Sequence, residues 1–164
     1  MIYLDTKTLI IALAVVILLF LFARYRRKAF VPFALALLVA TVWSFYFRYE
    51  YNGSNLFLMD RINVYPLILW TVGLTGLQLT SYEFPKRYRL ALVIILYLIL
   101  LIAAEAIGYH FLNIRLNSRY TSLLNLGVIH APVIMKMFYI FAGPVYLAFL
   151  SWLDRRGVLG AINE

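Results

Sequence analysis

Two ionisable side chains interrupt otherwise apolar segments, and they are the first candidates for chemistry in this chain. Glu105 lies in LIAAEAIGYH (residues 101–110), and Lys136 lies in HAPVIMKMFY (residues 130–139). An unpaired charge at the centre of a bilayer costs about 2.5–3.5 kcal/mol on insertion scales. Because both segments have the composition of membrane helices, each charge requires a partner or a polar cavity, and such residues commonly mark functional sites.

The two charges are predicted to lie at the same depth. The two predicted helices follow each other and form an antiparallel hairpin, so residues equally far from the turn lie at similar depth. His110 is near the end of the first helix, and His130 is near the start of the second. Glu105 then lies about 7.5 Å inward from His110, and Lys136 about 9 Å inward from His130, at 1.5 Å per residue. We therefore expect Glu105 and Lys136 to reach each other, either as an ion pair that locks the helices together or as the lining of a polar cavity.

The two histidines are not expected to lie on the same helix faces as Glu105 and Lys136. On an ideal helix Glu105 and His110 are about 140° apart, and His130 and Lys136 about 120° apart. Both pairs share one face only if Gly108 or Pro132 distorts its helix. Otherwise the histidines flank the charged pair.

The candidate catalytic residues belong to this hairpin, and the candidate substrate-binding residues surround its outer end. The catalytic candidates are Glu105, Lys136, His110 and His130, and the substrate-binding candidates are Tyr109, Asn113, Arg115, Arg119, Tyr139, Arg48, Asp60 and Arg61. Carboxylate and imidazole groups suit proton transfer, and arginines suit a phosphate or carboxylate head group. We expect a pocket between the two helices that opens outward and sideways, toward an amphiphile with an anionic or polar head.

The elements that must hold these residues are membrane helices. Of the 164 residues, 65% are hydrophobic and 13% are charged, which is more apolar surface than a soluble domain of this size can bury. Spans of about 20 residues are predicted at 6–24, 29–48, 62–82, 89–111 and 127–152. The first lacks a small-residue cleavage site and is followed by RYRRK, so we expect it to remain as a span. The fold class is all-α, a polytopic transmembrane bundle of five spans, with residues 1–164 as a single transmembrane domain.

The basic residues predict how the chain crosses the membrane. Nine lie on one side, namely Arg24, Arg26, Arg27, Lys28, Lys86, Arg87, Arg89, Arg155 and Arg156. Five lie on the other, namely Lys7, Arg48, Arg61, Arg115 and Arg119. The positive-inside rule then places the N-terminus outside and the C-terminus in the cytoplasm of a multi-pass plasma- or inner-membrane protein. Because this rule already explains the net charge of +8, no nucleic-acid partner is expected.

Several kinds of site are excluded by residue type. The chain has no cysteine, which excludes thiolate nucleophiles, thiolate metal sites and disulfides. It also lacks a Gly-rich phosphate loop, an HExxH motif and the histidine boxes of di-iron enzymes. We predict no metal site and leave the cofactor unassigned.

Four functions are compatible with these features. The favoured hypothesis is a membrane-embedded enzyme acting on a lipid or isoprenoid-like amphiphile, with Glu105 as acid or base and His110 or His130 as its proton partner. A small carrier would use Glu105 and Lys136 as exchanging partners. A b-type haem protein would ligate iron with His110 and His130. A non-catalytic membrane subunit, in a homo-oligomer or a larger membrane complex, would use the polar stripes as contacts.

Overall fold

The described residues form a bundle of helices with a pair of short antiparallel strands. The structure, a computed structural model, describes residues 5–47, 51, 58–59, 62–116 and 120–157. Its α-helices are α1 (Thr6–Tyr25), α2 (Phe30–Phe47), α3 (Val64–Ser81), α4 (Arg89–Ala106) and α5 (Val133–Arg155). The 3₁₀ turns η1 (Arg26–Ala29) and η3 (Leu123–Asn125), the π-helical turn η2 (Ile107–Phe111), and the antiparallel strands β1 (Leu58–Met59) and β2 (Ile62–Asn63) complete it. The predicted all-α class is confirmed.

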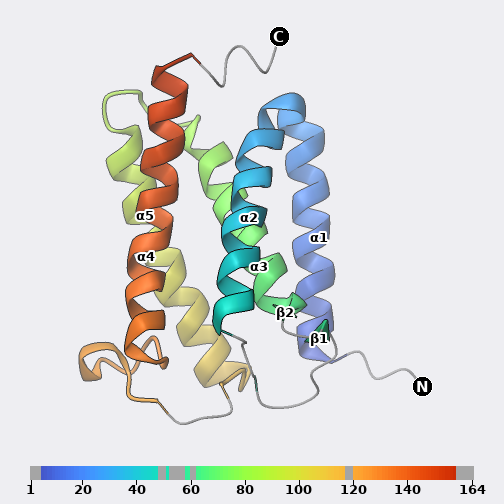
Figure 1. Cartoon of the computed structure of the whole chain (residues 1–164), viewed down its shortest axis with the longest axis vertical. Coiled ribbons are helices and arrows are strands. Elements are labelled where there is room, and N and C mark those ends of the chain that lie inside the picture. The colour runs from blue at the N-terminus through green and yellow to red at the C-terminus, as the bar shows by residue number, and fades with distance from the viewer. Residues whose placement is uncertain (1–4, 48–50, 52–57, 60–61, 117–119, 158–164) are drawn as a thin grey trace.

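Part of the described chain has the length and composition of membrane segments. Three stretches are long and apolar enough to cross a membrane, namely Thr6–Phe47, Arg89–Phe111 and Val133–Arg155. The first contains both α1 and α2, which Figure 1 draws side by side with η1 as the turn between them. Side chains along α1 such as Leu13, Val16 and Leu19 are exposed, as expected where lipid covers an apolar helix.

The predicted start of the last helix is wrong. The helix was expected from residue 127, but α5 begins at Val133, after Pro132 with an extended backbone (φ −56°, ψ 152°). Gly127 and Ile129 have positive φ angles of 71° and 55°, which a right-handed α-helix does not accommodate. The apolar run VIHAP therefore belongs to the connector before α5.

The ends of the helices gather at two ends of the bundle (Figure 1). One end holds η1, the α3–α4 turn and the end of α5, joined by the ion pairs Arg24–Glu83 (3.1 Å) and Arg89–Asp154 (3.5 Å). Hydrogen bonds from Arg24 and Tyr25 lower the pKa of the Glu83 carboxyl. At the other end a bridge between Tyr51 and Leu116 links the connectors that precede α3 and α5.

Helix α3 is the most buried helix of the bundle and carries polar side chains into its interior. Thr71, Thr75 and Gln78 are at most 3% exposed. The Thr71 hydroxyl donates to the Leu67 carbonyl, and the Thr75 hydroxyl donates to the Thr71 carbonyl. These bonds along the helix satisfy the hydroxyls internally, so α3 tolerates polar residues while packing against α1, α2 and α4.

Candidate functional site

Glu105 and His130 lie together at the junction of α4 and the connector before α5. The Glu105 Oε1 atom accepts a hydrogen bond from the backbone N–H of His130 at 3.0 Å. The His130 Nδ1 atom lies 3.7 Å from the same oxygen, and this nitrogen is buried and has no hydrogen-bond partner among the described residues. The carboxylate is thus fixed by the connector, while the imidazole lies beside it at a distance that a small movement would close.

The connector that presents His130 has an unusual backbone. Ile129 is 1% exposed and has φ 55°, a conformation that a β-branched residue rarely adopts. Such backbone conformations cost about 1–3 kcal/mol and cluster at functional sites, where the surrounding fold holds them. Here burial of the Ile129 side chain among Ala131, Met135 and Tyr139 holds the backbone so that the next N–H points to Glu105.

A stack of planar groups supports the His130 ring. Its ring lies parallel to Tyr109 at 3.7 Å between centroids, and the Arg115 guanidinium lies 4.6 Å from the centroid of Tyr109. The ring of His110 meets His130 edge-on at 6.0 Å. The end of α4 is distorted by the π-helical turn Ile107–Phe111, which contains Gly108. A distortion at Gly108 was one of the two conditions under which the histidines could join the charged residues.

The expected pairing of Glu105 with Lys136 is not formed. Lys136 is 8% exposed, and its Nζ atom donates to Thr121 Oγ1 at 3.3 Å and to the Ser122 carbonyl at 3.2 Å. Within the part of the chain that the structure describes, Lys136 has no carboxylate partner. The connector before α5 folds back over the first turn of that helix and brings its own oxygen atoms to the ammonium group. Each charge is therefore satisfied separately.

The geometry of the histidines does not favour haem ligation. His110 Nε2 lies 2.9 Å from the Gly127 carbonyl, which only accepts hydrogen bonds, so this nitrogen carries a proton and is not available to iron. Among the described residues there is no group of three or more His, Cys, Asp or Glu side chains placed to hold a metal ion.

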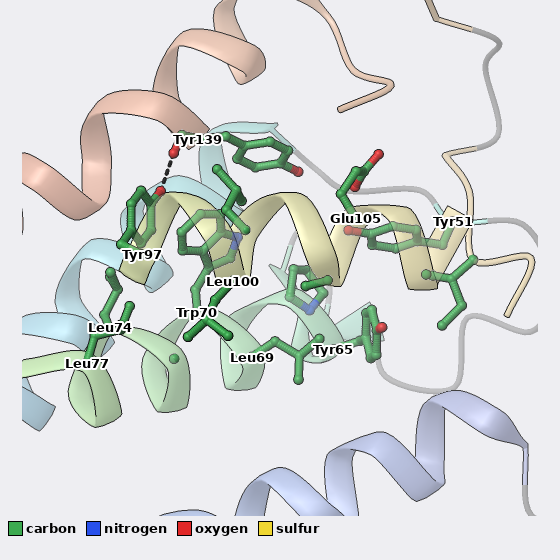
Figure 2. A pocket seen from close by; sticks show the side chains of 16 residues that line it. Tyr51, Tyr65, Leu69, Trp70, Leu74, Leu77, Tyr97, Leu100, Glu105 and Tyr139 are labelled. Carbon is green, nitrogen blue, oxygen red and sulfur yellow. Dashed lines mark hydrogen bonds between the residues drawn. The ribbon is translucent and has the colours of Figure 1, made fainter. Parts of the chain in front are cut away.

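A cavity of about 280 Å³ adjoins Glu105, but it lies mainly between α3 and α4 and not between the last two helices as expected. It is lined by Tyr51, Tyr65, Pro66, Leu69, Trp70, Gly73, Leu74, Leu77, Tyr97, Leu100, Leu101, Ala104, Glu105, Gly108, Ile114 and Tyr139. Figure 2 shows Glu105, Tyr51 and Tyr65 at one end and Tyr97, Leu74 and Leu77 at the other. Gly73, Leu100 and Ala104 are exposed, so the cavity opens sideways between the two helices.

The inner end of the cavity is fixed by a close contact between α4 and α5. The ring of Tyr97 packs directly on Gly143, and its hydroxyl donates to the backbone carbonyl of Tyr139. Both Tyr97 and Tyr139 line the cavity (Figure 2). The absence of a side chain at Gly143 therefore sets the position of the inner wall.

The candidate residues predicted from the sequence fall into three groups: those that line the cavity, those beside it, and those outside the described residues. Of the candidates, Glu105 and Tyr139 line the cavity, and Tyr109, His110, Arg115 and His130 form the cluster beside Glu105. Asn113 lies just beyond η2 with φ 53°. Arg48, Asp60, Arg61 and Arg119 lie outside the described residues.

Apart from Tyr139, the aromatic residues of the cavity wall were not predicted from the sequence. Tyr51, Tyr65 and Trp70 come from the connector before α3 and from α3 itself. Their signal was the density of aromatic residues near the outer end of a predicted span that also contains Gly73. Comparison of the chain with protein-family models, curated proteins and solved structures gives no match.

Proposed function

We propose that this chain is a five-span protein of the plasma or inner membrane, with its N-terminal end outside and its C-terminal end in the cytoplasm. Helices α1, α2 and α3 have 20, 18 and 18 residues, which are lengths of about 27–30 Å. The hydrocarbon core is about 30 Å thick. The basic turns after α1 and α3 lie at the same end of the bundle as the end of α5, which supports this orientation (Figure 1).

Its function in this proposal is enzymatic action on a lipid or isoprenoid-like amphiphile whose apolar chain lies in the cavity. The observation that carries the proposal is a sideways-opening, largely apolar cavity with a carboxylate at one end. Known ligand pockets have volumes of about 300–1,000 Å³, so 280 Å³ suits one chain and not a two-chain phospholipid. From Tyr65 to Leu77 the wall runs about 18 Å along α3, comparable to one leaflet of the hydrocarbon core.

Acid–base chemistry is assigned to the end of the cavity where the head group would lie. Glu105 is the only one of the candidate catalytic residues among the described lining residues. It acts as acid or base on the head group, and His130, with Nδ1 3.7 Å from Oε1, is its proton partner. His110 and Tyr109 position the His130 ring, and Lys136 fixes the connector through Thr121 and Ser122.

Lipid extracts of membranes containing the protein test this function. Mass spectrometry should find one single-chain amphiphile enriched with the purified wild-type chain, and a changed ratio of two related species in whole membranes. Gly73→Leu should abolish the enrichment, because a Cβ at Gly73 would meet no atom within 4 Å and the added side chain would fill the cavity. Gly73→Ala, a smaller change at the same position, should reduce it less.

Glu105→Gln tests the carboxylate as the acid or base of the reaction. It should retain the shape of the cavity but leave the ratio of the two species as it is in membranes without the protein. An unchanged ratio of species with the wild-type chain itself would contradict an enzyme, and equal enrichment with Gly73→Leu would contradict the cavity as the binding site.

A further inference from the structure

The charge of the cavity is opposite to that of the whole chain. The chain has 15 Lys and Arg residues against 7 Asp and Glu residues, giving a net charge of +8. Among the described lining residues, however, Glu105 alone is charged. Lys136 is directed into the connector by Thr121 and Ser122. A ligand head at this end of the cavity therefore meets a negative charge, and an anionic head would be repelled.

Aromatic faces surround the path from this carboxylate into the cavity. Tyr51 and Tyr65 meet at 85° with centroids 5.5 Å apart, and the Lys7 ammonium lies 5.8 Å from the centroid of Tyr51, so Tyr65 is the ring of this pair that no cation among the described residues contacts. Deeper in, Trp70 and Tyr139 lie 5.3 Å apart at 32°. Aromatic rings attract ammonium groups through their negative faces, and cages of such rings are a recurring means of recognising them. Rings and a carboxylate in one cavity are the two chemical features that recognise an organic cation.

Glu105 also retains an acceptor for a ligand. Its Oε1 atom is occupied by the backbone N–H of His130 at 3.0 Å. Oε2 accepts no hydrogen bond from any residue in the described ranges. A donor on the ligand head can therefore reach this oxygen without displacing the contact that holds the connector in place.

Building on the proposed function, we propose that the amphiphile is a single-chain amine bound as its ammonium ion. Its N–H groups donate to Glu105 Oε2, and the ring of Tyr65 contacts the cationic head, with Tyr51 beside it. Its apolar chain runs past Trp70 toward Leu74 and Leu77 (Figure 2). Of the anionic or polar head considered from the sequence, only a polar, cationic head is kept in this proposal, because the outer basic residues in the described ranges do not line the cavity.

Three probes of equal length and different head charge test this assignment. The full chain in phosphatidylcholine nanodiscs is titrated at neutral pH with decylamine, decanol and decanoate, and binding is followed by tryptophan fluorescence. Nanodiscs with Gly73→Leu provide the signal from partition into the bilayer, which is subtracted. Decylamine should bind most tightly and decanoate least. Glu105→Gln should weaken decylamine binding by about tenfold or more and change decanol binding little.

Two further variants keep the result interpretable. Glu105→Asp retains the charge and should retain the preference for the amine over the alcohol. Glu83→Gln removes an exposed carboxylate from the other end of the bundle and should leave all three affinities unchanged. Equal binding of decylamine and decanol, tighter binding of decanoate, or unchanged decylamine binding in a folded Glu105→Gln protein would overturn the amine. Absence of saturable, Gly73→Leu-sensitive binding for all three probes would instead overturn the proposed function.

Discussion

Replacement of Gly143 by alanine should separate α4 from α5 at the inner end of the cavity. An added Cβ would overlap two ring atoms of Tyr97 and lie 2.6 Å from a third, Cδ2. Carbon atoms in contact sit about 3.5–4.0 Å apart, so the ring or a helix must move by about 1 Å. The ring cannot retreat freely, because its hydroxyl donates to the Tyr139 carbonyl.

The magnitude follows from three opposing contributions. Overpacking in a closely packed interior costs about 1–3 kcal/mol, and weakening the Tyr97 hydrogen bond adds about 1 kcal/mol. Alanine regains about 1 kcal/mol of helix propensity relative to glycine. We expect a net loss of about 1–3 kcal/mol in the free energy of unfolding, together with weaker binding of any ligand in the cavity.

Unfolding in mixed micelles with increasing SDS, followed by circular dichroism, measures this loss. Gly76→Ala is the matched control, because its added Cβ would lie 3.5 Å from Leu21 Cδ1, an ordinary contact. That variant should be as stable as the wild-type chain or slightly more stable. If Gly143→Ala and Gly76→Ala unfolded at the same SDS fraction, the packing of Tyr97 on Gly143 would not be a constraint on the bundle.

The remaining predictions concern the basic end, the connector and the histidines. The pKa of Glu83 is lowered in the folded state, so its contribution to stability is present above its unfolded pKa and is lost as pH falls through the folded pKa. This loss of stability in acid, measured by SDS unfolding at several pH values, should be smaller in Glu83→Gln. Lys136→Met should release the connector from α5 and increase proteolysis near Thr121, whereas Lys136→Arg should largely protect it; equal proteolysis of both variants would contradict the role of Lys136. Freshly isolated protein should have no Soret absorption, because His110 Nε2 carries a proton toward Gly127; a Soret band lost in His110→Ala would refute this geometry.

The helices were predictable because their signal is local. The long apolar runs and the basic clusters predicted α1, α2, α3 and α4 to within two residues at each end, apart from the π-helical turn that continues α4. The start of α5 was not predictable from hydropathy, because VIHAP is apolar yet buries Ile129 in a non-helical conformation. Hydropathy reports burial and does not report the backbone conformation in which a residue is buried.

The candidate site was predictable only in part. Glu105 stands out in any apolar helix, and it lines the cavity. His130 was one of the two histidines expected as its partner, but the hydrogen bond between them was not predictable, because its donor is the backbone N–H of His130, a group that every residue except proline carries. The cavity was placed between the wrong helices because hairpin geometry relates only consecutive helices, whereas the position of α3 beside α4 depends on the packing of the whole bundle.

Photo-crosslinking of a bound chain tests whether the cavity between α3 and α4 holds the apolar chain of an amphiphile with its head at Glu105. A decyl probe with a diazirine at its terminal carbon, prepared with an amine and with a hydroxyl head, is irradiated with the full chain in nanodiscs and mapped by peptide sequencing. A chain held in the cavity should give labels on Leu74, Leu77 or Tyr97 that disappear in Gly73→Leu. Labels spread over the exposed residues of α1 and α2, and unchanged in Gly73→Leu, would contradict it.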